Sequence, residues 1–210
     1  MTASDRDAVA TTRRSLHVVA EELMAGPQYR VSATIRLRVS EGGIETVELP
    51  TLRLDGETLA LADRVAELDG RTVADVARQL DLVAGPPVGA YPRSQSDRAE
   101  ESLVVDPSSV HRLMAAFEVG QAALTAFAPD QIPVLWPEHF DLGIQRDEVN
   151  YGLSGGDSYH EFPYAYVGPW STLEGDFWNA PFGAARPVGP HTEAVEILEF
   201  FGRGRELARG

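Results

Sequence analysis

The spacing of apolar residues predicts a helix followed by antiparallel strands at the start of the chain. Residues 6–25 carry apolar side chains at helical intervals, and Gly26-Pro27 is expected to end that helix. Over residues 29–39 apolar and polar positions alternate, which predicts a half-buried strand. Glu41-Gly42-Gly43 would then turn the chain into a second strand over residues 44–49.

Turn and capping signals extend this pattern toward a boundary near residue 100. Asp55-Gly56 lies between two pairs of leucines and is a strong signal for a hairpin. Thr72 and Asp75 have the spacing of a capping box, so a second helix is expected to begin there and to end near Leu80. Residues 84–102 are rich in Pro, Gly and Ser and form the predicted linker.

The two predicted halves, residues 1–100 and 101–210, share one order of elements. In the second half Asp106-Pro107 begins a helix, strands follow, and Pro190 opens a last helix. Helix, strands and helix in each half predict an α+β fold, an antiparallel sheet with flanking helices. The halves are either a degenerate repeat or parts of one compact domain. The strands expected in the second half are residues 132–136, 140–145, 149–153 and 164–167.

Aromatic and acidic residues gather in the second half, which makes it the predicted location of a ligand site. Eleven of the seventeen aromatic residues fall between Trp136 and Phe182, together with eight carboxylates and a single arginine. His139 and His160 lie in the same stretch. Ligand sites are typically lined by rings, and a few polar groups orient the ligand.

Composition excludes several chemistries and partners. The chain has no cysteine, so a thiolate metal site or cysteine nucleophile is excluded, and all eighteen basic residues are arginine, so a catalytic lysine is excluded too. A net charge of −14 argues against nucleic acid and anionic lipid as partners. No secretory signal and no apolar run of about 20 residues are present, which predicts a cytoplasmic protein without a membrane partner. The pattern neither requires nor excludes a homo-oligomer.

Two short segments combine imidazoles with carboxylates and form the candidate site. Residues 136–141 would place His139 and Asp141 on one face of a strand, and residues 157–161 form a loop after two glycines. Two histidines with carboxylate oxygens suit a divalent metal such as zinc, iron or manganese. The alternative is two separate polar turns whose histidines form local hydrogen bonds. The candidate metal ligands are His139, Asp141, Asp157 and His160.

Acid–base and binding roles are predicted for the same two segments and for neighbouring rings. Flat rings beside carboxylates stack on ligands, although each ring is equally able to fill an ordinary core. Tyr164 and Tyr166 would share one strand face and therefore one environment. The candidate catalytic residues are His139, His160 and Glu161. The candidate ligand-binding residues are Trp136, Glu138, Tyr151 and Trp170.

Residues 152–156 match the Gly-x-Ser-x-Gly pattern of a serine nucleophile. That motif requires a strand before the serine and a helix after it. Pro163 lies where the helix would run, so the glycines are better explained as a turn.

The runs WPEHFDLGI, VNYGLSGGDSYHEFPYAYVGPW and FWNAPFGA resemble those of a set of small uncharacterised actinobacterial proteins. The likeness extends to TTRRSLHVVAEELMAGPQYR near the start. It implies a cytoplasmic protein and assigns no activity, cofactor or catalytic residue.

Two functions are compatible with these patterns. One is a small-molecule-binding protein or enzyme with an acidic, aromatic-lined pocket that holds histidines and carboxylates, with or without a divalent metal. The other is a non-enzymatic interaction or scaffold module in which the rings form a core or a partner-binding surface.

Overall fold

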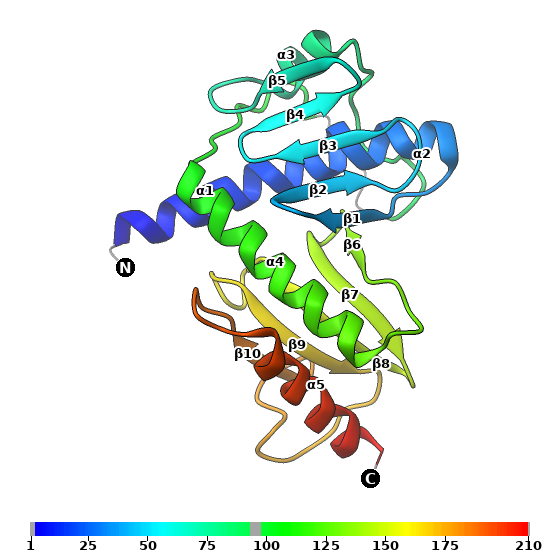
Figure 1. Cartoon of the computed structure of the whole chain (residues 1–210), viewed down its shortest axis with the longest axis vertical. Helices are drawn as coiled ribbons and strands as arrows, with labels where there is room; N and C mark the ends of the chain where they lie inside the picture. The colour runs from blue at the N-terminus through cyan, green and yellow to red at the C-terminus, as the bar shows by residue number, and fades with distance from the viewer. Residues whose placement is uncertain (1–2, 93–97, 210) are drawn as a thin grey trace. The chain divides into compact units, whose positions relative to one another are not determined.

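The computed structural model describes residues 3–92 and 98–209, and it has the predicted α+β architecture (Figure 1). The chain forms two compact units. Unit 1 comprises Met1–Met114 and Leu135–Phe140, and unit 2 comprises Ala115–Val134 and Asp141–Gly210. The chain therefore passes between the units three times, and the linker predicted at residues 84–102 lies within unit 1.

Unit 1 combines an N-terminal helix with an antiparallel sheet and a short helix. Every registered pairing of its strands is antiparallel, in the order β6-β1-β2-β3-β4-β5. The predicted hairpin at Asp55-Gly56 is confirmed between β3 and β4, and the Thr72–Asp75 capping box is confirmed at the start of α3. Its elements are α1 (Ala3–Val18), η1 (Val19–Ala25), α2 (Gly26–Ser32), β1 (Leu37–Ser40), β2 (Gly43–Thr46), β3 (Leu52–Asp55), β4 (Thr58–Leu61), β5 (Arg64–Glu67), α3 (Val73–Leu80) and β6 (Val134–Trp136).

The prediction that Gly26-Pro27 ends the first helix is wrong, because a π-helical segment carries the chain past it. In η1 the Gly26 N–H bonds to the carbonyl of Glu21, five residues back. Pro27 has no N–H to offer the carbonyl of Glu22, and that carbonyl instead accepts the N–H of Gly85 at 3.0 Å. A side chain at position 26 would collide with the Gly85 carbonyl, so glycine is required where this loop approaches the helix.

The strand predicted over residues 29–39 is only partly correct. Residues up to Ser32 belong to α2, and the strand β1 begins at Leu37. The alternation of polar and apolar residues did not indicate α2. This helix is only seven residues long and continues directly from η1. Ala33, in the left-handed conformation, ends it.

Gln28 of α2 connects the helix to the sheet. It is fully buried, and its amide nitrogen donates to the carbonyls of Thr34 and Arg36 at 3.0 and 2.9 Å. Its amide oxygen accepts the N–H groups of Val47 and Glu48 at 2.7 and 2.8 Å. The side chain thus satisfies backbone groups that lack partners in the β-ladder.

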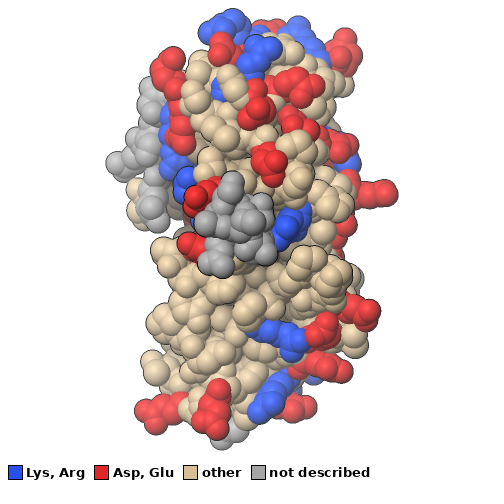
Figure 2. All heavy atoms as spheres, turned by 90° about the vertical axis from the view of Figure 1, so that its left-hand side faces the viewer, with Lys and Arg blue, Asp and Glu red and all other residues tan. Residues whose placement is uncertain are grey.

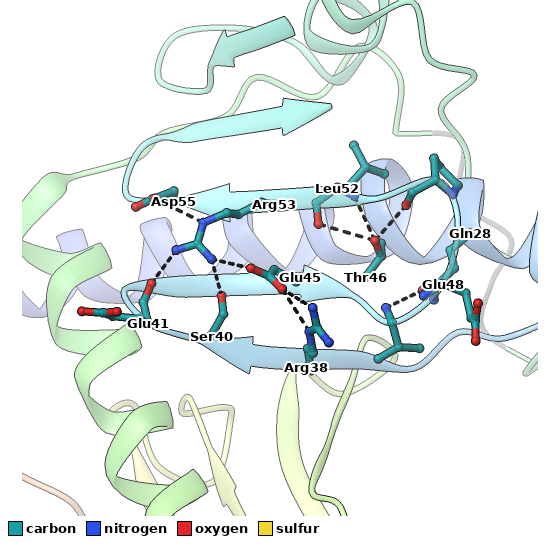
Figure 3. A network of polar contacts seen from close by, with 12 residues as sticks. Gln28, Arg38, Ser40, Glu41, Glu45, Thr46, Glu48, Leu52, Arg53 and Asp55 are labelled. Atoms are coloured by element: carbon teal, nitrogen blue, oxygen red, sulfur yellow. Dashed lines mark hydrogen bonds and ion pairs between the residues drawn. The ribbon is translucent and has the colours of Figure 1, made fainter. Parts of the chain in front are cut away.

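The outer face of the β1–β3 sheet is a network of charged residues (Figure 3). Glu45 on β2 lies between Arg38 on β1 and Arg53 on β3, its cross-strand neighbours, and forms an ion pair with each. The Arg53 guanidinium also bonds to the Ser40 hydroxyl and to the carbonyl of Glu41. Arg38 and Arg53 are therefore each paired with a carboxylate on this face.

Unit 2 is an antiparallel sheet with helices on one face. The strands lie in the order β10-β9-β8-β7. A two-residue turn joins β7 to β8, and both of its residues, Asp147 and Glu148, have positive φ, as a type I′ hairpin requires. The elements are the second part of α4 (Pro107–Phe127), β7 (Asp141–Arg146), β8 (Val149–Ser154), β9 (Tyr164–Pro169), β10 (Ala184–Pro187) and α5 (Ala194–Ala208).

The two faces of the unit 2 sheet differ in character. On the first face, apolar side chains pack against α4 and α5, where Gly120 lies against Leu153 and Gly204 lies against Val167 (Figure 1). The second face carries polar side chains, glycines and the tyrosines of β9. Cross-strand register places these residues together: Asp141, Gly143, Gly152, Ser154, Tyr164 and Tyr166.

Candidate functional site

Gly143 and Gly152 leave the space in which Tyr166 lies across the polar face of unit 2. The two glycines are cross-strand neighbours, and Tyr166 is the neighbour of Gly152 on β9. A Cβ atom on either glycine would meet the phenol of Tyr166. The Tyr166 hydroxyl reaches β7 and donates a hydrogen bond to the carboxylate of Asp141.

A second tyrosine–carboxylate pair lies beside the first. Asp141, Ser154 and Tyr164 form one cross-strand row, and the Tyr164 hydroxyl donates to Asp157 at 2.6 Å. The expected shared face of Tyr164 and Tyr166 is therefore confirmed. Each tyrosine fixes one of the carboxylates that the sequence singled out.

The environment of these phenols keeps both protonated. Burial raises the pKa of Tyr164 and of Tyr166, and the adjacent carboxylates, Asp157 and Asp141 respectively, raise it further. Both hydroxyls consequently remain hydrogen-bond donors throughout the neutral range.

The segment 157–161 is the polar turn that was the alternative interpretation. One carboxylate oxygen of Asp157 accepts the backbone N–H groups of Tyr159 and His160 at 2.8 and 3.1 Å. Asp157 in turn donates its own N–H to the carbonyl of His160 at 2.8 Å. Asp157 thus shapes the loop and ties it to Tyr164 of the sheet.

His160 is held in one orientation by this turn. Its Nδ1 lies 2.9 Å from the carbonyl oxygen of Phe162, and its ring meets the edge of Tyr164 at 5.9 Å between centroids. The backbone N–H of Phe162 also approaches Nδ1, at 3.3 Å, and the shorter contact with the carbonyl favours the tautomer with the proton on Nδ1. In this tautomer the ring presents a lone pair at Nε2, for which the described residues provide no hydrogen-bond partner.

Residues 137–140 form a turn and not the start of a strand, so the prediction that His139 and Asp141 share one strand face is wrong. Phe140 has a positive φ of 51°, and β7 begins only at Asp141. The break also coincides with the division between the units, since His139 belongs to unit 1 and Asp141 to unit 2.

The other candidates of residues 136–141 interact locally within unit 1. His139 Nε2 lies 2.9 Å from Glu138 Oε1, and the His139 side chain is exposed. The guanidinium of Arg36 lies 5.9 Å from the ring centroid of Trp136. Because His160 belongs to unit 2, the convergence of the two histidines stays a prediction.

Among the remaining candidates of unit 2, Tyr151 belongs to the core. It is 1% exposed on the helix-facing side of β8, where its ring packs against Phe127 and Phe201 at 4.6 and 5.8 Å. It therefore does not share a face with Tyr164 and Tyr166. Glu161 and Trp170 are exposed.

The serine of the Gly-x-Ser-x-Gly pattern lies at the end of β8, and bends and coil follow it in place of a helix. Its hydroxyl accepts the N–H of Gly156 at 3.1 Å, which confirms the turn predicted from the glycines. Within residues 3–92 and 98–209, no three His, Asp or Glu side chains are grouped so that they could hold a metal ion.

Unit 1 contains a buried polar cluster around η1 that the sequence analysis missed. Glu21 is only 5% exposed, and its carboxylate accepts a 2.7 Å hydrogen bond from Tyr91 and lies 3.6 Å from Arg98. His17, one turn earlier, stacks on Phe140, and burial lowers its pKa. π-Helical turns are frequent at functional sites. Here the carboxylate anchors residues 91 and 98 to the helix.

Only one feature of the sequence indicates this cluster. Glu21 and Glu22 interrupt an otherwise apolar stretch, and in the structure both are buried. The partners Tyr91 and Arg98 are 70 and 77 positions further along, within the predicted linker.

No protein-family model, curated protein or solved structure matches this chain. The resemblance to actinobacterial proteins accordingly stays a prediction. None of the described helices combines the length and the apolar character that crossing a membrane requires.

Proposed function

We propose that the chain is a small-molecule-binding protein or enzyme whose site lies on the polar face of the unit 2 sheet. In this proposal His160 is the acid–base group, and the tyrosine–carboxylate pairs, Tyr164–Asp157 and Tyr166–Asp141, form the fixed polar floor. The proposal includes a cytoplasmic location, supported by the absence of cysteine, and excludes nucleic acid as a partner because of the charge of −14.

The state of His160 carries the proposal. The Phe162 carbonyl at 2.9 Å favours the tautomer with the proton on Nδ1, which leaves Nε2 as a hydrogen-bond acceptor, and no described residue donates to it. The same arrangement is typical of histidines that act as general bases.

The two tyrosine–carboxylate pairs add preorganisation to this site. Hydroxyls with raised pKa hold Asp141 and Asp157 in place. Asp157 belongs to the same turn as His160, so a carboxylate lies close to the imidazole. A ligand with an acidic hydroxyl or ammonium proton suits this arrangement.

A thermal-shift screen of small molecules against the wild type, His160→Ala and His191→Ala tests the proposal. His191 is an exposed histidine of the same unit and serves as the control. We expect some compounds to stabilise the wild type and His191→Ala but not His160→Ala, by about 2.7 kcal/mol for a ligand at a hundredfold excess over its Kd. Compounds that stabilise all three proteins equally, or no stabilising compound at all, would refute the proposal.

An interaction module is the second candidate, and exposed large apolar side chains favour it. Trp170 is 62% exposed in unit 2, and Ile132 of the same unit is 84% exposed. Contiguous apolar patches mark surfaces that bind other proteins, and under this alternative Trp170 belongs to such a patch. Under this alternative Trp170→Ala would abolish binding of a protein partner, whereas His160→Ala would leave it unchanged.

A further inference from the structure

Three aromatic rings form a cluster above the loop that Asp157 shapes. Tyr159, Tyr164 and Phe182 have ring centroids 5.0 to 6.1 Å apart, and Tyr159 meets the other two edge-on. Tyr164 is buried beneath the outer rings, whereas Tyr159 and Phe182 are 43% and 37% exposed. We call these three residues the ring cluster. Its outer rings present π-electron surface to solvent next to a fixed carboxylate.

All charged residues in the part of the sequence that holds the ring cluster are acidic. Residues 147–185 contain no arginine or lysine. They contain six carboxylates: Asp147, Glu148, Asp157, Glu161, Glu174 and Asp176. Because ring faces and carboxylates both attract cations, the two features reinforce each other.

The arginines of unit 2 that could approach these rings are engaged elsewhere. Arg203 and Arg205 lie over the rings of Phe177 and Phe127, at 5.7 and 4.9 Å from their centroids. Arg146 and Arg186 form ion pairs with Asp130 and Glu196. In the described part of the chain, no cation lies over Tyr159 or Phe182.

Asp157 places a carboxylate beside the ring cluster. Its carboxylate accepts one hydrogen bond from Tyr164 and two from backbone N–H groups, which together hold it in place. The Tyr159 N–H is one of these donors, so the carboxylate lies next to the backbone that carries the outer ring.

We propose that the ring cluster binds a small organic cation, and that the ligand of unit 2 carries a quaternary or methylated ammonium group. This inference rests on the proposed function and specifies the ligand class of that site. A methylated ammonium is weakly hydrated, so its removal from water costs less than that of a primary ammonium, and aromatic surfaces recognise it well.

Choline and its uncharged isostere 3,3-dimethylbutan-1-ol provide a direct test, because they share a shape and differ in charge. Binding is measured by NMR titration of the ring resonances of the full chain. We expect choline to bind at least about fivefold more tightly than the isostere. Equal binding of the two compounds, or binding of neither, would overturn the inference.

Substitutions in the ring cluster test where choline binds. Tyr159→Leu and Phe182→Leu remove ring faces at exposed positions and should each weaken choline binding about threefold or more. Tyr159→Phe keeps the ring and should bind like the wild type, and Tyr29→Leu removes a ring of unit 1 as a matched control. Loss of binding in Tyr29→Leu, or none in either ring-cluster variant, would contradict the assignment.

Two outcomes separate this inference from the proposed function. If neutral or anionic compounds give shifts that depend on His160 while choline does not bind, the site stands and the cation assignment fails. If choline binds through Tyr159 and Phe182 but no ligand effect depends on His160, the cation site stands and the acid–base role fails. An arginine-containing peptide that binds where choline does not would show that a protein supplies the cation, and would also overturn the small-molecule assignment.

Discussion

Gln28 has an amide whose hydrogen-bonding capacity is completely used inside unit 1. Both donor positions and both acceptor positions are occupied by backbone groups of residues 34, 36, 47 and 48. Its removal would leave four backbone groups without partners in a part-buried place. The sequence does not distinguish this glutamine from an exposed one.

Gln28→Ala is expected to lower the free energy of unfolding by more than about 3 kcal/mol, because each unpaired buried backbone group costs about 1–3 kcal/mol. Gln79→Ala is the control, since exposed Gln79 makes a single bond to the carbonyl of Val65 and should cost less than about 1 kcal/mol. Urea denaturation measures both values. Similar losses in the two variants would show that the Gln28 bonds do not hold helix and sheet together.

Because of Glu45, the free energy of unfolding of unit 1 is expected to depend on pH in the acidic range. Burial alone would raise its pKa, but the hydrogen bonds and charges of Arg38 and Arg53 outweigh burial and lower the pKa below its ordinary value. A carboxyl whose pKa is lower in the folded state contributes stability above its unfolded pKa of about 4.3, and that contribution is lost as the pH falls through the folded pKa.

Glu45→Gln should therefore destabilise the protein by about 1 kcal/mol at pH 7, a modest value because Arg38 is largely exposed. The difference in unfolding free energy between variant and wild type should become smaller as the pH falls from about 5 toward 2. Glu67→Gln, at an exposed position of β5, is the control and should show no such dependence. A gap that is constant or widens in acid contradicts this account of the network.

At the scale of elements, η1 and the Gly85 loop depend on each other. The π-helical turn frees the carbonyl of Glu22 for the loop, and the loop occupies the space that a side chain at position 26 would need. Glycine at position 26 is thus required by packing and not by φ, which is an ordinary −61°.

Gly26→Ala is expected to cost about 3 kcal/mol or more, because the methyl group must displace the backbone of Gly85. Gly202→Ala in α5 has open space around it and should instead stabilise the protein by about 0.5–1 kcal/mol through helix propensity. Thermal or urea unfolding compares the two. An unchanged free energy of unfolding in Gly26→Ala would mean that the Gly85 loop does not pack closely against the helix.

Elements were predictable from the sequence where a local signal determined them. The capping box of Thr72, the turn at Asp55-Gly56 and the helix start at Asp106-Pro107 each depend on residues within four positions. The continuation of the helix through Gly26-Pro27 was not predictable, because its cause is a loop some 60 positions away.

The candidate site was only partly predictable for the same reason. The aromatic and acidic composition indicated the segment that holds the proposed site, and the expectation that Tyr164 and Tyr166 share one face is confirmed. The neighbours of these tyrosines follow from strand register, which is set by a turn of two non-glycine residues, Asp147 and Glu148, that the sequence does not mark. That Tyr151 packs in the core was not predictable, because a tyrosine of the core and one of a site look alike in sequence.

For the whole molecule, the dominant property is the excess of 32 acidic over 18 basic side chains. Carboxylates and arginines are interspersed on the face shown in Figure 2, so part of the charge is compensated locally. The remaining charge of −14 repels itself in the folded state more than in the expanded unfolded chain.

Added NaCl is therefore expected to raise the melting temperature, with a gain on the order of 1 kcal/mol in unfolding free energy between about 10 and 150 mM, where the Debye length falls from about 30 to 8 Å. Differential scanning calorimetry at several salt concentrations measures the change. A melting temperature that falls with salt would show that ion pairs such as Glu45–Arg53 outweigh the net repulsion.

The order in which unit 1 is assembled follows from the path of the chain. Leu135–Phe140, with the β6 residue that pairs with Leu37 of β1, comes after Ala115–Val134 of unit 2. During synthesis, Ala115–Val134 of unit 2 therefore leaves the ribosome before β6 can pair with β1 and complete the sheet of unit 1. Until residue 140 emerges, the nascent polypeptide carries an open β1 edge, and chaperones would find their binding surface there.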